Sequence, residues 1–542
     1  MKVFLLHRDR DFEAKHELRD SIFYAMTSGE VFAVANARRD AGLERKRNPA
    51  LVEAQAGTDG VLTQDLELQT LWNAMAAGDE FLYETAKRVT LSSLTDPDEI
   101  RYRQHVLADC IANSDTISEI YTLTLEALEN ERQTGSLWSG ADPDRILSRS
   151  VQILKLQVDV LKRLRKLGEE HADQFESEGF DRFFAMLKEE LDDEYLATVE
   201  HHLDKLAFRR GLLESAALGK GLKGRGYVVR TQRELNWKER FLPGNRPAGY
   251  SFTIPPRDES GFRALQDIRG RGLNHLADAV ARSADHVKSF FAILRIEVAF
   301  YLGCLNLERL LNERAEPTCF PTPIDQSADA FSCEGLYDVC LALHVDEHVI
   351  GNELDADSRS LIVITGANQG GKSTFLRSVG LAQLMMQAGM FVGSNSLRAN
   401  VCSGLFTHYK REEDAAMEGG KLDEELARMS AIAERIQPRS LLLCNESFAS
   451  TNEREGSQIA REVVRALLAR RVKVFFVTHM YDLSHGFELE QSDAALFLRA
   501  ERQQDGKRTF KLLEGEPLPT SYGADSYRRI FGSDDEAVAS SR

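Results

Sequence analysis

The stretch LIVITGANQGGKST, residues 361–374, restricts the possible folds of this chain more than any other part of it. It matches the pattern GxxxxGK[ST], whose fixed positions are Gly366, Gly371, Lys372 and Ser373. In this pattern the glycines let backbone N–H groups approach phosphate oxygens closely. The apolar run at 361–365 predicts a buried strand before the loop, and residues 372–387 predict a helix after it. The positive end of the helix dipole would face a bound phosphate, so we expect a P-loop within an α/β fold.

The rest of the chain predicts more than one domain. With 542 residues it is too long for a single hydrophobic core. Beyond about residue 316, short apolar runs alternate with helical stretches, as in parallel strands joined by crossover helices. They predict strands at 441–444 and 472–478, and a helix at 457–469. We therefore expect a multidomain protein with an N-terminal segment, a helical core or lever domain and an α/β P-loop NTPase domain, at residues 1–65, 66–315 and 316–535.

Polar side chains follow the predicted strands at positions that suit nucleotide chemistry. Lys372 is expected to reach the β- and γ-phosphates of ATP, and Ser373 to give its hydroxyl to Mg²⁺. Glu446 follows the strand at 441–444, where a carboxylate can orient or deprotonate an attacking water. The alternative interpretation of Glu446 is a helix-capping acid. His479 follows the third strand and is placed to contact the γ-phosphate, because strand ends in a doubly wound sheet face the ligand crevice.

Asn445 stands directly before Glu446, where an aspartate usually holds a metal-bound water. Asparagine can accept a hydrogen bond but brings no charge to Mg²⁺. We expect Ser373 and Asn445 at the metal, with weaker magnesium binding than a carboxylate would give. The expected cofactors are ATP and Mg²⁺, and the expected nucleotide-binding residues of the loop are Gly366, Ala367, Asn368, Gln369, Gly370, Gly371, Lys372, Ser373 and Thr374.

The segment from about residue 66 to 312 is poor in proline and largely helical in pattern. Apolar residues recur there at alternating steps of four and three, at Val280, Ala284, Val287, Phe291, Leu294, Val298, Tyr301 and Leu305. This heptad stripe predicts a helix over 276–313, about 57 Å long. Such a helix can act as a strut or lever, or it can be one helix of a bundle, because periodicity shows a packed face and not its partner.

A basic segment interrupts this helical pattern. Residues 209–246 hold ten basic and three acidic residues, a local charge of +7 in a chain of net charge −17. Basic residues interleaved with glycine and aromatic residues fit a surface that binds nucleic-acid phosphates and bases. The alternative is a solvated basic loop or an internal docking face. The candidate nucleic-acid contacts are Lys220, Lys223, Arg225, Arg230 and Arg233.

Cysteine usage and apolar runs indicate a cytoplasmic protein. The seven cysteines are scattered and lack CxxC spacing, which favours buried free thiols over disulfides or a zinc site. The N-terminus is too briefly apolar for a signal sequence, and no uncharged run approaches the length of a membrane span. Residues 3–6 are expected to form a short strand, while 1–65 as a whole suggests no function.

Several stretches of this chain resemble, in the same order, those of the MutS-type ATPases of DNA mismatch repair and recombination control. The stretch TGANQGGKST is similar to the family's TGPNMGGKST, and VIGNEL at 349–354 resembles an upstream element whose asparagine corresponds to Asn352. LTDPDEIRYRQHVLADC at 94–110 resembles the start of the family's helical core. The other matches are FTHYKREEDA, NESFASTNEREG, VTHMYDL and FKLLEGEPLPTSYG, at 406–415, 445–456, 477–483 and 510–523.

The resemblance implies an ATP-dependent protein that interacts with DNA. In such proteins helical levers connect a dimeric ATPase to a clamp around DNA, and a partner subunit completes each ATP site. It adds Asn352 to the expected nucleotide-binding residues, and it implies catalytic roles for Lys372, Glu446 and His479.

The sequence also departs from the family pattern. It holds no Phe-x-Glu, and only about 65 residues precede the helical part, so mismatch reading of that type is expected to be absent. The clamp is reduced to the basic segment. The chain ends soon after Tyr522, where relatives continue into a helical dimerisation element. Gly420 and Lys421 stand where relatives present Ser-Thr across the dimer, so either Lys421 contacts a phosphate instead or the contact is lost.

Three functions fit these features. The first is an ATPase that changes its grip on branched or distorted double-stranded DNA, as an ATP-dependent homodimer associated with the nucleoid. The second is a nucleotide-gated binding scaffold with little or no hydrolysis. The third is an ATPase that acts on a protein partner. None of them requires a membrane.

Overall fold

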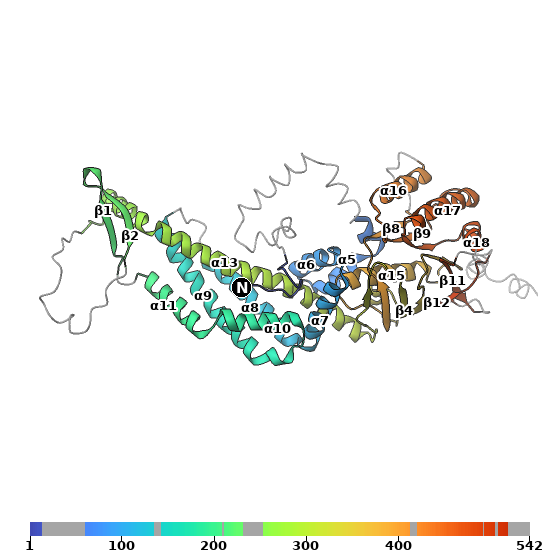
Figure 1. Ribbon diagram of the computed structural model, residues 1–542, viewed down its shortest axis with the longest axis horizontal. Coiled ribbons are helices and arrows are strands. Elements are labelled where there is room, and N and C mark those ends of the chain that lie inside the picture. The colour runs from blue at the N-terminus through green and yellow to red at the C-terminus, as the bar shows by residue number, and fades with distance from the viewer. Residues whose placement is uncertain are drawn as a thin grey trace, which may run out of the picture.

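The protein is elongated, with helices in its N-terminal part and an α/β unit in its C-terminal part (Figure 1). The β1–β2 hairpin, formed by Glu214–Leu218 and Gly224–Val229, lies at one end, and the α/β unit lies at the other. This computed structural model describes residues 1–12, 60–134, 142–208, 211–230, 253–411, 420–490, 493–503 and 508–518.

Helices α5 to α11 begin mostly at residues that the sequence marks as helix caps. The side chains of Asp79, Asp96, Asp142, Ser177 and Asp192 each accept hydrogen bonds from backbone N–H groups of the first turn. Two of these caps precede a proline at the first helical position, which needs no N–H partner there. The helices are α5 (Leu68–Ala76), α6 (Glu80–Leu91), α7 (Pro97–Ala112), α8 (Ser114–Thr134), α9 (Pro143–His171), α10 (Glu178–Glu190) and α11 (Asp193–Leu206).

Helix α13 (Glu259–Glu313) is the longest element and starts well before the predicted residue 276. Asp258 caps it, and Gly270 and Gly272 do not interrupt it. A Cβ on Gly272 would lie 2.2 Å from the Glu214 carboxylate, so the missing side chain lets the hairpin close on the helix. At about 1.5 Å per residue α13 is about 82 Å long. The sequence pattern missed its first part because that part buries few apolar side chains.

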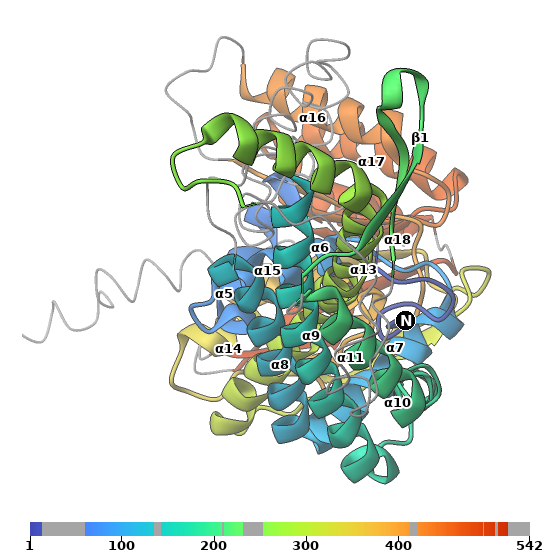
Figure 2. The same cartoon turned by 90° about the vertical axis from the view of Figure 1, so that its left-hand side faces the viewer.

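The heptad stripe packs in a bundle, and α13 also spans the length of the helical part. It contacts α9, α8, α5 and α6. Figure 2, viewed from the hairpin end, shows α13 among the helices of this part. Within the described part of the chain, α13 holds the one stretch long and apolar enough to cross a membrane. Of that stretch 78% is buried inside the protein, so it belongs to a core helix.

The α/β unit is built on a six-stranded sheet of order β12-β11-β6-β10-β9-β8, in which only β12 is antiparallel to its neighbour. A four-stranded sheet of order β3-β7-β4-β5 lies beside it. The strands of the first sheet are β6 (Leu361–Thr365), β8 (Leu405–Tyr409), β9 (Leu441–Asn445), β10 (Lys473–Val477), β11 (Ala495–Arg502) and β12 (Arg508–Glu514). Those of the second are β3 (Thr322–Ile324), β4 (Phe331–Leu336), β5 (Asn352–Asp355) and β7 (Ser396–Asn400).

Helices cover both faces of the six-stranded sheet. On one face α15 (Lys372–Gln387) contacts β8, β9 and β10, and on the other α17 (Glu453–Ala469) packs on β10. Helix α15 also contacts β4 of the four-stranded sheet. The remaining helices are α14 (Val339–His344), α16 (Lys421–Arg435) and α18 (Tyr481–Leu489). Central strands buried on both faces explain their uninterrupted apolar sequences. The predicted strand at 361–365 and helix at 372–387 are confirmed, whereas α17 begins at Glu453 and not at 457, because Asn452 caps it.

The N-terminal residues 1–12 do not form the expected strand at 3–6. The backbone N–H groups of Leu5 and Leu6 donate to Oε2 of Glu297, at 2.7 and 3.1 Å, and that of Phe12 donates to Oε1 at 2.7 Å. Because these donors bond to a side chain of α13, no strand partner is needed. The segment fills a position between α7 and α13, where Tyr301 donates to the carbonyl of Leu5.

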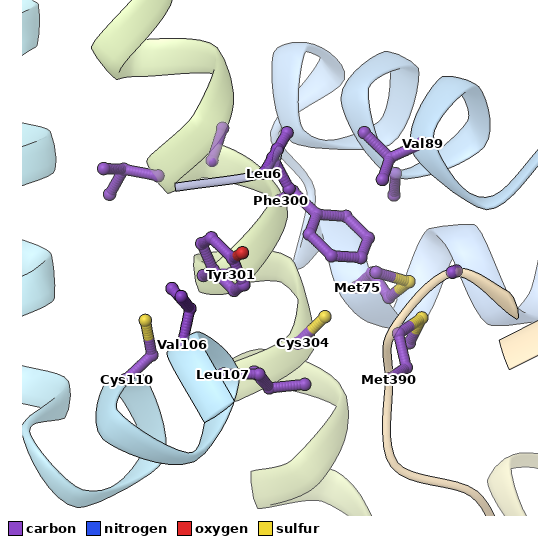
Figure 3. Close-up of a cluster of buried hydrophobic side chains, with 14 of the residues drawn as sticks. Leu6, Met75, Val89, Val106, Leu107, Cys110, Phe300, Tyr301, Cys304 and Met390 are labelled. Atoms are coloured by element: carbon purple, nitrogen blue, oxygen red, sulfur yellow. The ribbon is translucent and has the colours of Figure 1, made fainter. Parts of the chain in front are cut away.

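This junction forms a continuous apolar core. Figure 3 shows Leu6, Phe300 and Tyr301 packed with side chains of α5, α6 and α7, and with Met390 from the turn after α15. All seven cysteines are free, and six of them are buried. Burial raises the pKa of the Cys110 thiol, so it stays protonated and inert.

The buried Glu297 carboxylate predicts a pH dependence of stability. Burial raises the pKa of Glu297 from 4.5 to about 7, so the folded protein holds this proton where the unfolded chain releases it. The contribution of this bound proton to the free energy of unfolding is fully present below about pH 4.5 and is lost as the pH rises to about 7. We expect the unfolding free energy of the wild type, relative to Glu297→Gln, to fall by about 3 kcal/mol over this window. Urea unfolding of both proteins between pH 5 and 8 measures the difference, and a constant difference would contradict the assignment.

Candidate nucleotide site

Three parallel strands end at the same edge of the sheet and bring the predicted polar residues together. In the strand register Val477 of β10 lies opposite Ile364 of β6 and Asn445 of β9. The P-loop follows β6 and Glu446 directly follows β9. His479 is the second residue after the end of β10. The site is therefore placed by sheet topology, at the carboxyl ends of adjacent strands.

The backbone of the P-loop explains why glycine is needed at two of its positions. Gly366 has φ +114° and Gly371 has φ +88°, both in the region that side chains disfavour. A Cβ on Gly371 would lie 3.2 Å from the carbonyl oxygen of Phe510 in β12. A Cβ on Gly366 would lie 2.9 Å from the backbone nitrogen of Ala500 in β11. The β11–β12 hairpin thus lies directly against the loop.

Lys372 begins α15 and is 5% exposed. Its Nζ donates to the carbonyl oxygens of Gly366 at 3.0 Å and Ala367 at 2.9 Å. Burial lowers the pKa of Lys372 to about 8, and the nearby Glu446 carboxylate opposes this shift. A phosphate group would offer the ammonium a charged acceptor in place of neutral carbonyls. The ammonium group of Lys372 therefore lies where the P-loop motif places phosphate oxygens.

Glu446 and His479 form a hydrogen-bonded pair at the strand ends. His479 Nε2 donates to Oε1 of Glu446 over 2.8 Å, and this bond lowers the pKa of Glu446. The carboxylate is 32% exposed, so a water can reach it. Glu446 has φ +54°, and its N–H donates to the carbonyl of Val477, which holds this unusual backbone in place. The charged form of Glu446 is the one that can accept a proton.

Ser373 and Asn445 contact each other across the site. The Ser373 hydroxyl donates to Oδ1 of Asn445 at 3.0 Å. Two neutral oxygens at the mouth of a P-loop suit Mg²⁺, which keeps several waters and takes its remaining ligands from phosphates. The described residues contain no cluster of three metal-ligating side chains, so protein groups alone would not hold the ion there.

Asn352 lies beside the loop and fixes β12. Its Nδ2 donates to the carbonyl of Phe510 at 3.3 Å, and its Oδ1 accepts the N–H of Leu512 at 2.7 Å. Phe510 has φ +60°, and its side chain is 49% exposed at this position. Sequence reasoning had not singled out Phe510 or its neighbour Arg508, whose Nη1 donates to Oε1 of Gln369 in the loop at 3.1 Å. Only the pairing of β12 with β11 brings them to the loop.

Helix α16 is joined to the strand ends through a buried histidine. His408 Nδ1 lies 2.7 Å from the hydroxyl of Ser447, next to Glu446, and its Nε2 donates to the carbonyl of Glu425 in α16. Burial lowers the pKa of His408 to about 4, so the ring is neutral near pH 7. Gly420 and Lys421 lie at the exposed start of this helix.

The described part of the basic segment forms the β1–β2 hairpin. Lys220, Lys223, Arg225 and Arg230 are all exposed there, and Arg230 donates to the hydroxyl of Ser215. Arg233 lies outside the described residues. The hairpin and the P-loop are at opposite ends of the molecule, so the structure does not bring these two sets of residues together (Figure 1).

Two family models match this chain. The MutS2 N-terminal domain matches residues 95–314, and MutS domain V matches residues 362–534, the region of the P-loop, Glu446 and His479. The chain belongs to the MutS family. Its helical part is of the MutS2 N-terminal type, and its α/β unit is the ATPase domain that the MutS family shares.

Individual MutS-family relatives match about a third of this chain. The DNA mismatch repair protein MutS of Chloroflexus aurantiacus is 31% identical over 171 residues, 31% of this chain and 18% of that protein. The protein of the same name from Thermotoga petrophila is 32% identical over 197 residues, 35% of this chain and 24% of that protein. MutS protein homolog 4 of Homo sapiens is 24% identical over 197 residues, 35% of this chain and 21% of that protein. The chain thus spans less than a quarter of the length of these relatives.

Proposed function

We propose that this MutS-family protein binds ATP with Mg²⁺ at the P-loop and hydrolyses it. The observation that carries the proposal is the Glu446–His479 pair at the same sheet edge as Lys372 and Ser373. Glu446 would accept a proton from the attacking water, and His479 would hold Glu446 and contact the γ-phosphate. Lys372 would neutralise phosphate charge, and loop residues from Gly366 to Thr374 would surround the phosphates. Magnesium, held by Ser373, Asn445 and the phosphates, would supply further neutralisation.

We further propose that the protein couples this cycle to branched or otherwise distorted double-stranded DNA. The exposed basic hairpin would contact DNA phosphates, and α13 would connect it to the ATPase domain. Two of the relatives are named as DNA mismatch repair proteins, which supports a DNA substrate. An ATP-dependent homodimer fits the MutS family. Binding to DNA would place the protein in the cytoplasm, at the nucleoid.

Charge neutralisation in the hairpin tests the DNA contact. A variant with Lys220→Gln, Lys223→Gln and Arg225→Gln is expected to bind a branched duplex about tenfold more weakly at 0.1 M salt, with a shallower salt dependence. Fluorescence anisotropy with branched and linear DNA at several salt concentrations measures this. The control carries Lys155→Gln, Lys162→Gln and Lys166→Gln on α9, an equal charge change away from the hairpin. Equal affinities of the two variants would exclude the hairpin as the contact.

A second candidate function is a nucleotide-gated scaffold with negligible turnover, which Asn445 favours because it brings no charge to the metal. It predicts nucleotide binding without phosphate release. If the hairpin variant loses no DNA affinity but turnover persists, an ATPase that acts on a protein partner becomes the better account.

A further inference from the structure

The side chain of Arg508 reaches the P-loop from β12, and no described residue gives it an acidic partner. Its Nη1 donates to Oε1 of Gln369, at 3.1 Å, and Gln369 is the fourth residue of the loop. Among the residues that the structure describes, no carboxylate forms an ion pair with Arg508. A guanidinium that contacts only a neutral amide is available for a stronger, charged acceptor.

The backbone that carries Arg508 is fixed to the site. Arg508 pairs with Arg502 on β11, and two residues later the carbonyl of Phe510 lies against Gly371 and accepts the Asn352 amide. Thr509, between them, donates to Glu501 on β11 at 2.6 Å. The side chain of Arg508 therefore extends from a rigid strand and not from a free loop end.

The positively charged side chains of Arg508 and Lys372 both lie at the P-loop. Burial is the main cause of the lowered pKa of Lys372, and the positive charge of Arg508 across the loop adds to it. Glu446, the nearby carboxylate, is already hydrogen-bonded to His479. A polyanion between the two cations would relieve their repulsion, and a phosphate chain is the polyanion for which the loop is shaped.

We propose that Arg508 is an additional phosphate-binding residue, supplied by β12 of the same chain, which exchanges its bond to Gln369 for the β- or γ-phosphate of the nucleotide. This inference rests on the proposed ATP binding and adds a residue to it. A guanidinium can bind two phosphate oxygens at once, a geometry that lysine cannot reproduce. The contact would supply positive charge from within the same chain at a site whose metal position lacks a carboxylate.

Nucleotide affinity tests this inference. The Kd of Mg-ATP and Mg-ADP, measured from the fluorescence of their methylanthraniloyl derivatives, is expected to rise about tenfold in Arg508→Ala and by less in Arg508→Lys. The losses from Arg508→Ala and Gln369→Ala should multiply in the double variant, because each side chain would contact the nucleotide separately. Arg465→Ala removes an exposed arginine of α17 that pairs with Glu490, and it should bind as the wild type does.

Each other outcome overturns the inference. If Arg508→Ala binds ATP as tightly as the wild type, Arg508 does not contact phosphate, while the proposed nucleotide binding stands. If the double variant binds no more weakly than Gln369→Ala alone, Arg508 acts only by shaping the loop through Gln369. If the wild type binds neither nucleotide, the proposed function and this inference fail together.

Discussion

Glu446→Gln is expected to lower kcat for ATP hydrolysis by about 100-fold or more, with Kd for Mg-ATP changed by less than about threefold. Glutamine keeps the size and hydrogen-bonding capacity of the side chain, so it can still bond to His479. It cannot accept a proton from water. The effect should therefore fall on the chemical step, because the proposed phosphate ligands Lys372 and Ser373 form no hydrogen bond to Glu446 that the substitution would remove.

Steady-state phosphate release with Mg²⁺, with and without branched and linear DNA, measures this effect. Glu453→Gln is the matched control, since Glu453 is an exposed acid at the start of α17, seven residues further along. A wild type that binds ATP and releases no phosphate would favour the scaffold function, and Asn445→Asp would then be the variant to test for gained turnover. Equal turnover of wild type and Glu446→Gln would exclude Glu446 as the base.

Arg103→Met is expected to destabilise the protein by about 2–4 kcal/mol, from about 1–3 kcal/mol for each buried carbonyl left without a donor. Arg103 in α7 is 1% exposed, and its guanidinium donates to the carbonyls of Leu6 and Ala388 at 2.9–3.0 Å. Methionine fills a similar volume but leaves these buried carbonyls without a donor. Both the N-terminal segment and the end of the P-loop helix would lose an anchor.

The midpoint of urea unfolding measures the loss. His105→Met is the control, because His105 is exposed on the same helix two residues away and should change stability by less than about 0.5 kcal/mol. A midpoint equal to that of the control would show that the three hydrogen bonds contribute nothing net.

Local sequence features predicted the elements around the P-loop closely. The strand at 361–365 and the helix at 372–387 have the predicted bounds, because an apolar run, a glycine-rich turn and a helical period follow one another there. The order of the strands and their ends predicted that Lys372, Glu446 and His479 would lie near one another, since parallel strands share an edge.

Contacts between distant parts of the sequence were not predictable in this way. Glu297 binds a segment almost 300 residues away, and no local pattern marks an acid on a heptad helix as the acceptor of three backbone N–H groups. Arg508 reaches the loop only because β12 pairs antiparallel with β11, a choice set by tertiary packing. The start of α13 was missed because its first turns are exposed and contain glycines.

The length of α13 has a mechanical consequence. Its last turns, from Phe290 to Leu311, are largely buried against the helices next to the ATPase domain, and its first turn at the hairpin end lies about 60 Å along the helix from the middle of that section. Rotation about that buried section by only 5° would displace the hairpin by about 5 Å, more than the rise of one base pair along DNA. If the hairpin contacts DNA as we propose, a small rotation at the ATPase end of α13 would thus become a change of register on the DNA at the far end of the molecule.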